Sequence, residues 1–599
     1  MPVQTTDFVP VDRLESEVQR RLAAERQRLN AAAGLGEREQ FHRPVERAFV
    51  GEERSRVTIL FGGLTWKHEA LIQAAFQGNG YNCVVIPTPN VAAFQLGKEF
   101  GNTGQCNPTY FTVGNLIQYL QGLEKQGMSR QDIIDRHVFF TAGSCGPCRF
   151  GMYEAEYRFA LDNAGFNGFR VLLFQQQDGI KAASGEPGLK FTVNFGMSAL
   201  NAMLMGDVMN DLVYQIRPFE TRRGETDRVF EETILQLGRL LRERKAFELG
   251  EHNNVLAGLL RKNRKVKDTF SVLLKVLDHL YGKELYGGLR EAREHMDSIE
   301  VDRTKVRPVV KITGEFWAQI TEGDGNFHMF RFLEREGAQV IVEPIATWVA
   351  YMIHQVRMNA VARRRADAPH PDAAWYQFRE RLANEMKFRQ KWLALAAGEA
   401  IWNHFYHRLT KRLGGITHHL VPQKELAELA QPFYHRLARG GEGHLEVGKN
   451  VYYTVNHMCH MVLGLKPFGC MPSSQSDGAQ SGVVNRYKEM IYLPIETSGE
   501  GEVNAHSRVQ MALGEAKVKA KAEFATALAA SGKSLEQIRE YVGEHPELKR
   551  PFYRVPHREG IAGTAAQFVL HVSDRMDHDA AWWRRARIVV PRAHAAAAR

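Results

Sequence analysis

Short runs of β-branched and aliphatic residues alternate with helical segments, and this alternation constrains the fold more than any other feature. The run at 56–61 (RVTILF) precedes a Gly62-Gly63 turn and a helical stretch over 67–76, and a second run at 82–86 stops before a proline. A strand–helix–strand unit of this length predicts two parallel strands with a right-handed crossover. The alternation continues with predicted helices over 115–123 and 153–164 and predicted strands over 137–141 and 170–174.

A second α/β block begins at 307–312 (RPVVKI) and continues through a helix over 327–336 and a strand over 339–342. We therefore predict an α/β protein with two Rossmann-like open parallel-sheet domains, helical insertions, and helical N- and C-terminal extensions. The predicted segments are a helical N-terminal extension (1–50), the first α/β domain (51–225), a helical insertion (226–300), the first part of the second α/β domain (301–365), another helical insertion (366–440), the second part of that domain (441–520) and a charged helical tail (521–599).

Composition narrows the class of protein. Apolar residues make up 44% of the 599 positions and charged residues 24%, which excludes wholesale disorder. No apolar run is long enough to cross a bilayer, the N-terminus does not resemble a secretory signal, and six cysteines in so long a chain do not indicate a disulfide framework. We expect a cytoplasmic protein without a membrane partner. The net charge of +10 permits anionic partners, but we find no nucleic-acid-binding motif and do not expect nucleic acid.

Two of the six cysteines are interpreted as core residues. Cys83 lies inside the predicted strand NCVVI, where alternation favours a small buried side chain. Cys459 lies between His457 and His460 in VNHMCHMVLGL, which we interpret as a helix. Neighbouring positions on a helix point in different directions, so these three side chains are not expected to converge on one metal ion.

The other four cysteines lie in loops punctuated by glycine or proline. Cys106 occurs in GNTGQCNPTY, Cys145 and Cys148 in TAGSCGPCRFG after the strand HVFFT, and Cys470 in KPFGCMPSS. In an open parallel sheet, loops that follow strands emerge at the carboxyl edge, where ligands bind. Loops from two such blocks can meet across a cleft, so the four thiols are candidates to surround one site.

Three chemistries compete for these thiols. Zinc accepts four thiolates, but zinc ribbons usually offer two CxxC pairs and only one occurs here. A thiol–disulfide oxidoreductase would use the Cys145-Gly146-Pro147-Cys148 dithiol at a strand–helix junction and would leave Cys106 and Cys470 without a role. A 4Fe-4S cluster would use all four as ligands, and we favour this interpretation.

At these residues the chain also resembles a known family. The segments GNTGQCNPTY, FFTAGSCGPCRFGMY and KPFGCMPSS are similar to those of 2-hydroxyacyl-CoA dehydratases and their double-cubane-cluster relatives, in particular the dehydratase-like component associated with the activating ATPase. The stretches VVKITGEFWAQI, GDGNFHMFRFLEREGAQVIVEP and ETSGEGEVNAHSRVQ extend the resemblance over about residues 55–515. The GPCRFG and PFGCMP segments carry most of its specificity.

The resemblance implies an oxygen-sensitive 4Fe-4S protein whose cluster ligands are Cys106, Cys145, Cys148 and Cys470. A separate ATP-hydrolysing activator with its own cluster would supply the electron, and a second dehydratase-like subunit or a homodimer would complete the enzyme. The reaction would be radical dehydration of a 2-hydroxyacyl-CoA, a hydro-lyase activity, or reduction of a small molecule. A non-catalytic electron carrier or scaffold would also hold a cluster and stays open as an alternative.

The chain departs from the family in two respects. Double-cubane members need about six cysteine ligands, whereas only four cysteines lie in the matching loops. The chain also lacks a GxxxxGK[ST] phosphate loop, so we do not expect it to hydrolyse ATP by itself.

Several polar residues near these motifs are candidates for substrate or cluster contacts. Arg149 would balance cluster charge or form a surface ion pair, and Glu315 would act in acid–base chemistry or cap a helix. Ser473 and its neighbours after Cys470 would donate hydrogen bonds to cluster sulfides. His506 lies in EVNAHSR and would contact an anionic substrate or start a helix. Lys311, Ser474, Ser476, Asn504 and Arg508 complete this set of candidates.

Overall fold

The computed structural model describes residues 11–32, 46–143, 148–175, 188–245, 264–438 and 441–589. The chain divides into two compact units, Met1–Val45 and Glu46–Arg599. The first unit contains helix α1 (Val11–Ala32), and every other element belongs to the second. In the described part of the chain, no helix is long and apolar enough to span a membrane.

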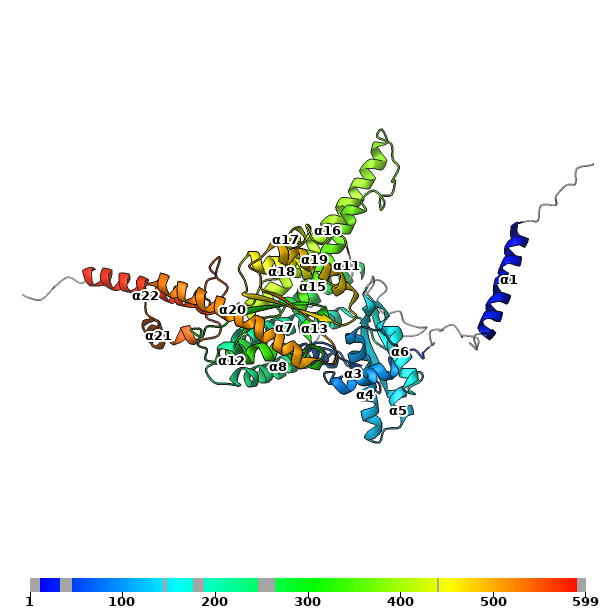
Figure 1. Ribbon diagram of the computed structural model, residues 1–599, viewed down its shortest axis with the longest axis horizontal. Coiled ribbons are helices and arrows are strands. Elements are labelled where there is room, and N and C mark those ends of the chain that lie inside the picture. Colours follow the sequence, from blue (N-terminus) through cyan, green and yellow to red (C-terminus); the bar gives the residue numbers. More distant parts are fainter. Residues whose placement is uncertain are drawn as a thin grey trace, which may run out of the picture. The chain divides into compact units, whose positions relative to one another are not determined.

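The first sheet has four parallel strands in the order β2-β1-β3-β4. Its strands alternate with helices, as the sequence pattern predicts (Figure 1). The strands are β1 (Thr58–Phe61), β2 (Asn82–Val85), β3 (His137–Gly143) and β4 (Arg170–Gln175), and the helices are α2 (Trp66–Gly78), α3 (Val91–Phe100), α4 (Asn107–Lys125), α5 (Arg130–Arg136) and α6 (Tyr153–Asn163).

The second sheet repeats this topology with four parallel strands in the order β6-β5-β7-β8. Every residue of its central strands is buried, as in sheets that helices cover on both faces. The strands are β5 (Val309–Gly314), β6 (Gln339–Ile341), β7 (Met461–Pro467) and β8 (Tyr492–Thr497), and the helices are α13 (Phe316–Ile320), α14 (Met329–Arg335), α15 (Ile345–Ala362), α18 (His444–Val455) and α19 (Met471–Arg486). The prediction of an α/β protein with parallel sheets is therefore confirmed.

Helices form most of the other described segments of the second unit. Between the two sheets the chain forms α7 (Val193–Ile216), η3 (Arg217–Phe219), α8 (Glu225–Glu243), α11 (Arg264–Tyr281) and α12 (Lys283–Met296). The long helix α16 (Phe378–Arg412) stands away from the body of this unit in Figure 1, and its four buried residues all lie near its C-terminal end. The others are α17 (Gln423–Ala430), α20 (Glu502–Ser531), α21 (Leu535–Glu544) and α22 (Thr564–Val589).

The largest hydrophobic cluster joins the second sheet to helices of the intervening segment. It contains Leu71 of α2, Met205 of α7, Leu237 of α8 and Leu289 of α12 together with Ile312 of β5, all at most 1% exposed. Because one continuous apolar core includes α2 and β5, both sheets are tied into the same compact unit.

The interpretation of the segment VNHMCHMVLGL (455–465) as a helix is wrong. Helix α18 ends at Val455, His457 takes a left-handed backbone conformation (φ 49°), and β7 begins at Met461. Cys459 therefore lies in the short connection that enters a buried strand. A short apolar run without clear alternation fits either a buried strand or a helix, and the tertiary structure selects the strand here.

Helices α3 and α4 lie against each other through glycines that leave no room for a side chain. A Cβ atom on Gly97 would lie 2.0 Å from the carbonyl oxygen of Tyr110, and a Cβ on Gly114 would lie 1.8 Å from that of Ala93. Side chains at these positions would force the two helices apart. This close approach fixes α4, the helix that begins next to Cys106.

We expect Gly114→Ala to destabilise the protein by about 1–3 kcal/mol or more, because the methyl group would collide with backbone atoms of α3. Gly122→Ala on the same helix is the matched control, since nothing lies within 4 Å of its added Cβ. The control is expected to stabilise α4 by up to about 1 kcal/mol. Urea unfolding followed by circular dichroism measures both, and equal effects of the two variants would contradict the proposed packing.

Candidate functional site

Three of the four predicted ligand cysteines belong to the described residues, and each lies immediately before a helix. Cys106 precedes α4, Cys148 precedes the short 3-10 helix η2 (Arg149–Met152), and Cys470 precedes α19. None of these side chains caps its helix through a hydrogen bond. The positive dipole ends of the long helices α4 and α19 therefore favour negative charge near Cys106 and Cys470.

The sheet topology places the loop with Cys148 in the first sheet and the loop with Cys470 in the second sheet at equivalent positions. In the first sheet β2 and β3 lie on opposite sides of β1, and in the second sheet β6 and β7 lie on opposite sides of β5. Ligands of open parallel sheets bind beyond the carboxyl ends of such strand pairs. The loop after β3 leads to Cys148, the loop after β7 leads to Cys470, and Glu315 directly follows β5. Cys145 lies outside the described residues.

The loops that carry Cys106 and Cys470 touch each other. The N–H of Asn107 donates to the carbonyl of Phe468 (3.1 Å), and its side-chain amide donates to the carbonyl of Thr497 (2.6 Å). A Cβ on Gly469 would lie 3.2 Å from Cys106 Cα, and this glycine has a φ of 75° that favours glycine. The start of α4 therefore packs directly on the end of β7 and β8.

The Cys148 segment joins the same cluster of loops. Arg149, the residue after Cys148, donates to the carbonyl of Gly104 (2.6 Å) in the Cys106 loop. The Cys106 sulfur lies 3.2 Å from both the Tyr153 hydroxyl of α6 and the Thr109 hydroxyl of α4. Arg149 thus contacts the Cys106 loop rather than forming a surface ion pair with a described carboxylate.

Burial keeps the Cys148 and Cys470 thiols protonated in the absence of a metal. It raises the pKa of Cys148 to about 12, and Glu442, Glu315 and Cys106 lie close enough to add to that rise. Burial also raises the pKa of Cys470, again with contributions from Glu315 and Glu442. Because the same two carboxyl groups act on both thiols, all five residues occupy one region.

Two carboxyl groups accompany the thiols. Glu315 caps α13 by accepting from the N–H of Ala318 (3.0 Å), and Glu442 accepts from the N–H of Phe316 (2.5 Å). Burial raises the pKa of Glu315 to about 7 and that of Glu442 to about 8, and the proximity of Glu315 adds to the rise at Glu442. The second oxygen of Glu442, a residue 3% exposed, has no hydrogen-bond partner among the described residues. The pair can hold or release protons near neutral pH.

Glu442 is the main site residue that the sequence interpretation missed. It lies in a connection between helical segments, where neither strand position nor cysteine spacing draws attention to it. The signal available was its setting between Gly441 and Gly443, both with positive φ (53° and 51°). Such a glycine pair indicates a tight backbone path that holds one side chain in place.

The serines after Cys470 lie at the site, but they serve different roles. The hydroxyl and amide of Ser473, a residue 2% exposed, lie close enough to the Cys470 sulfur to oppose the burial-driven rise in the pKa of that thiol. Ser474 donates to the carbonyl of Cys470 (2.9 Å), within the first turn of α19. Ser476 donates to the buried carboxylate of Glu446 (2.6 Å). Ser473 is therefore the best placed to interact with a group bound at Cys470.

Other candidate residues lie elsewhere. The His506 imidazole of α20 contacts the carbonyl of Phe327 (2.8 Å) and stacks on the Phe332 ring at 3.8 Å, so it packs α20 against α14. Arg508 donates to the carbonyl of Pro494 (3.1 Å). Lys311 is fully buried and donates to Glu343 (2.7 Å). Asn504 lies in the exposed first turn of α20.

The two cysteines interpreted as core residues lie outside the site. Cys83 is 2% exposed in β2, and burial raises its pKa strongly. Cys459 packs against a small hydrophobic cluster beside Tyr453, and burial raises its pKa to about 12. Core packing is therefore confirmed for Cys83, and Cys459 also contacts apolar neighbours.

The residues present fit an iron–sulfur cluster. A cluster accepts thiolates and hydrogen bonds to sulfur, and the site offers buried thiols, hydroxyl groups and the positive dipole ends of two long helices. Bound metal would replace the thiol protons that burial otherwise retains. No group of three or more His, Cys, Asp or Glu side chains in the described ranges is arranged to hold a single metal ion. A cubane differs in that it spreads its ligands over separate iron corners.

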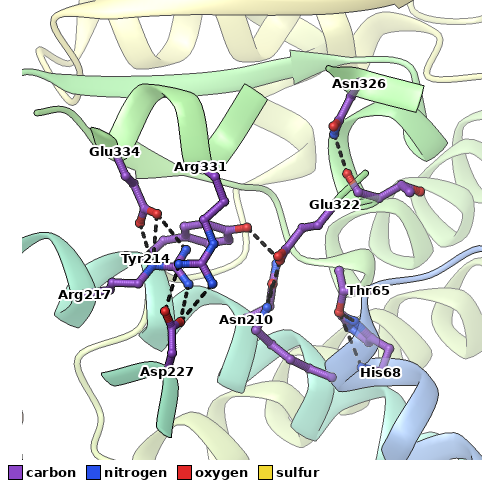
Figure 2. Close-up of polar contacts among 12 residues, drawn as sticks. Thr65, His68, Asn210, Tyr214, Arg217, Asp227, Glu322, Asn326, Arg331 and Glu334 are labelled. Atoms are coloured by element: carbon purple, nitrogen blue, oxygen red, sulfur yellow. Dashed lines mark hydrogen bonds and ion pairs between the residues drawn. The ribbon is translucent and has the colours of Figure 1, made fainter. Parts of the chain in front are cut away.

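A buried ion pair links the start of α2 to the segment after α13. Lys67, fully buried, donates to Glu322 (2.8 Å) and to Asn210 of α7 (3.1 Å). The Tyr214 hydroxyl donates to the same Glu322 oxygen (2.7 Å; Figure 2). Burial by itself raises the pKa of Glu322, but the charge and hydrogen bond of Lys67 outweigh it and bring the pKa down to about 2.

A second group of ion pairs continues this network (Figure 2). Arg217 of η3 pairs with Glu334 of α14 (2.7 Å) and with Asp227 of α8 (2.8 Å), and Arg331 of α14 also pairs with Asp227 (2.9 Å). These contacts hold α14 of the second sheet against the helices between the sheets. The charged network therefore helps to fix the loops with Cys106 and Cys148 relative to the loop with Cys470.

The chain matches no model of a known protein family and no curated protein.

We expect Glu322→Gln to destabilise the protein by about 3–5 kcal/mol at neutral pH, because it leaves the Lys67 ammonium buried without a counter-charge. Since the pKa of Glu322 is lowered from 4.5 to about 2, its contribution is fully present above pH 4.5 and is lost as pH falls towards 2. The stability difference between parent and variant should therefore shrink over that range.

Urea unfolding at several pH values between 2 and 7 tests this expectation. Glu232→Gln is the control, because that carboxylate forms an exposed pair with Arg228, and its loss should change stability by at most about 1 kcal/mol. Equal stabilities of parent and Glu322→Gln at pH 7, or a difference that grows on acidification, would contradict the assignment.

Proposed function

We propose that this protein binds a 4Fe-4S cluster through Cys106, Cys145, Cys148 and Cys470 and performs low-potential one-electron chemistry. It would act as a dehydratase-like component similar to that of 2-hydroxyacyl-CoA dehydratases. The observation that carries the proposal is the convergence of three thiols from loops far apart in the sequence, two of them at the starts of long helices. The bound cluster would supply one-electron transfer, as such clusters do over a wide range of potentials.

The surrounding residues have roles that follow from their positions. Arg149 would offset negative charge beside Cys148, and the Tyr153 and Thr109 hydroxyls would orient the Cys106 sulfur. Glu315 and Glu442, with pKa values of about 7 and 8, would exchange protons with a substrate that gains an electron or loses water. The electron would come from an ATP-hydrolysing activator, because this chain has no phosphate loop of its own.

The dithiol alternative would use Cys145, the first thiol of the CGPC segment, as its reactive thiol, because a helix start would lower the pKa of that thiol. It gives no role to the contact between the Cys106 and Cys470 loops. A thiol–disulfide oxidoreductase would also need neither Cys106 nor Cys470. An electron carrier would bind the same cluster but would convert no substrate of its own. Adding an activator, ATP and 2-hydroxyacyl-CoA candidates under anaerobic conditions therefore distinguishes such a carrier from the proposed enzyme.

Iron and sulfide analysis after anaerobic reconstitution tests the cluster directly. We expect about four iron ions per chain and an EPR signal on reduction. Cys470→Ser should lose most of the iron, because it removes one of the four ligands. Cys83→Ser, which changes a buried cysteine in β2, is the matched control and should keep the iron content of the parent.

Two results would contradict this proposal in different ways. Full iron content in Cys470→Ser would remove Cys470 from the ligand set. About eight iron ions per chain would exclude a single cube and would require further ligands such as Cys459 or Cys83.

Gly469→Ala tests whether the contact between the Cys106 and Cys470 loops is needed. The added Cβ would lie 3.1 Å from the carbonyl oxygen of Gln105, and alanine disfavours the φ of 75°. We expect the Cys470 loop to move away from Cys106 and the iron content to fall severalfold. Gly478→Ala in α19, with nothing within 4 Å of its Cβ, should keep full iron content. Equal iron in both variants would show that the contact does not shape the site.

A further inference from the structure

A cavity between α12 and the C-terminal end of α16 gathers positive charge. Its volume is about 710 Å³, within the range of roughly 300–1,000 Å³ of small-molecule sites. Four cationic side chains line it, with one carboxylate among them: Arg290, Arg293, Lys411, Arg412 and Glu291. Among the described residues, none of the cysteines of the proposed cluster lines this cavity, so the two sites are separate.

Three of these cations lack an acidic partner. Within the described ranges, Arg293, Lys411 and Arg412 form no ion pair. Arg412 instead lies over the Tyr286 ring at 4.0 Å, and Arg293 lies over the Phe552 ring at 6.0 Å. These aromatic contacts hold the guanidinium groups in place without neutralising them.

The two remaining charged side chains do not cancel this excess. Arg290 pairs with Glu294 one helical turn away (3.1 Å), and Glu291 accepts from the Gln236 side-chain amide (3.1 Å). The cavity therefore keeps unpaired cations on two different helices, α12 and α16. Like charges that converge without a counter-charge repel one another, and a multiply charged anion between them relieves that repulsion.

We propose that this cavity binds a small molecule that carries a polyphosphate chain. Guanidinium and ammonium groups are the usual partners of phosphate oxygens, and several of them favour a ligand with more than one negative charge. Gly287 lines it without a side chain, and nothing lies within 4 Å of a Cβ added there, so the space beside α12 is open to a ligand.

Basic residues near helix C-termini also stabilise the helix dipole without any ligand. Arg293 lies in the last turn of α12, and Lys411 and Arg412 lie in the last turn of α16. That role alone predicts no saturable binding of a soluble anion, so titration distinguishes the two explanations.

Isothermal titration calorimetry of the full-length protein with tripolyphosphate tests the proposal. We expect saturable binding with one site per chain, and ATP should bind at the same site through the same phosphate chain. Adenosine should not bind. Lys411→Gln combined with Arg412→Gln should weaken tripolyphosphate binding at least tenfold. Arg21→Gln combined with Arg28→Gln on exposed positions of α1 changes the net charge equally and should leave binding unchanged.

A second variant blocks the space without changing the charge. Gly287→Leu fills the open side of the cavity and favours the helix, so the protein should fold while tripolyphosphate binding falls at least tenfold. Circular dichroism checks that each variant is folded. Absence of saturable tripolyphosphate binding by the parent, or equal affinities of the parent and both cavity variants, would overturn the proposal.

Discussion

The contact between the start of α4 and the end of β7 is the constraint on which the candidate site depends. Cys106 lies between α3 and α4 of the first α/β block, Cys470 follows β7 of the second sheet, and the close approach of Gly469 to the Cys106 backbone brings them together. The amide of Asn107 secures this approach from the α4 side. Farther away, the Lys67–Glu322 ion pair and the largest hydrophobic cluster hold the two sheets together. The positions of the thiols therefore also depend on many distant contacts.

The sequence predicted those helices and strands whose apolar periodicity agrees with glycines and prolines at their ends. Strands β1 to β6 and helices α2, α4, α6 and α14 were predicted because glycines, prolines and alternating apolar residues, which act over a few positions, mark them in the sequence. Helices α3, α5 and α7 were not predicted. Cys459 shows the limit of this reasoning. The run from Met461 to Pro467 is buried on both faces and has no alternation, so its strand conformation follows from pairing with β5 and β8.

The candidate site could be predicted in part for the same reason. The cysteine loops carry glycine and proline signals in their own sequence, and Glu315 follows a predicted strand. Glu442 reaches the site through a contact with Phe316, 126 positions away in the chain, and the Lys67–Glu322 pair spans 255 positions. No local pattern encodes such pairings, because they arise from how whole sheets pack.

Placing cysteine at helix starts has a consequence for how this protein can change over evolution. Serine and aspartate are better capping residues than cysteine, because an oxygen is a stronger hydrogen-bond acceptor than a thiol sulfur, and neither Cys106 nor Cys470 caps its helix through a side-chain hydrogen bond. Selection for thermal robustness alone would therefore drive both positions towards oxygen-bearing residues and erase the sulfur donors. Retention of cysteine at both positions among related proteins would therefore indicate selection for the chemistry of sulfur at a cost in helix stability.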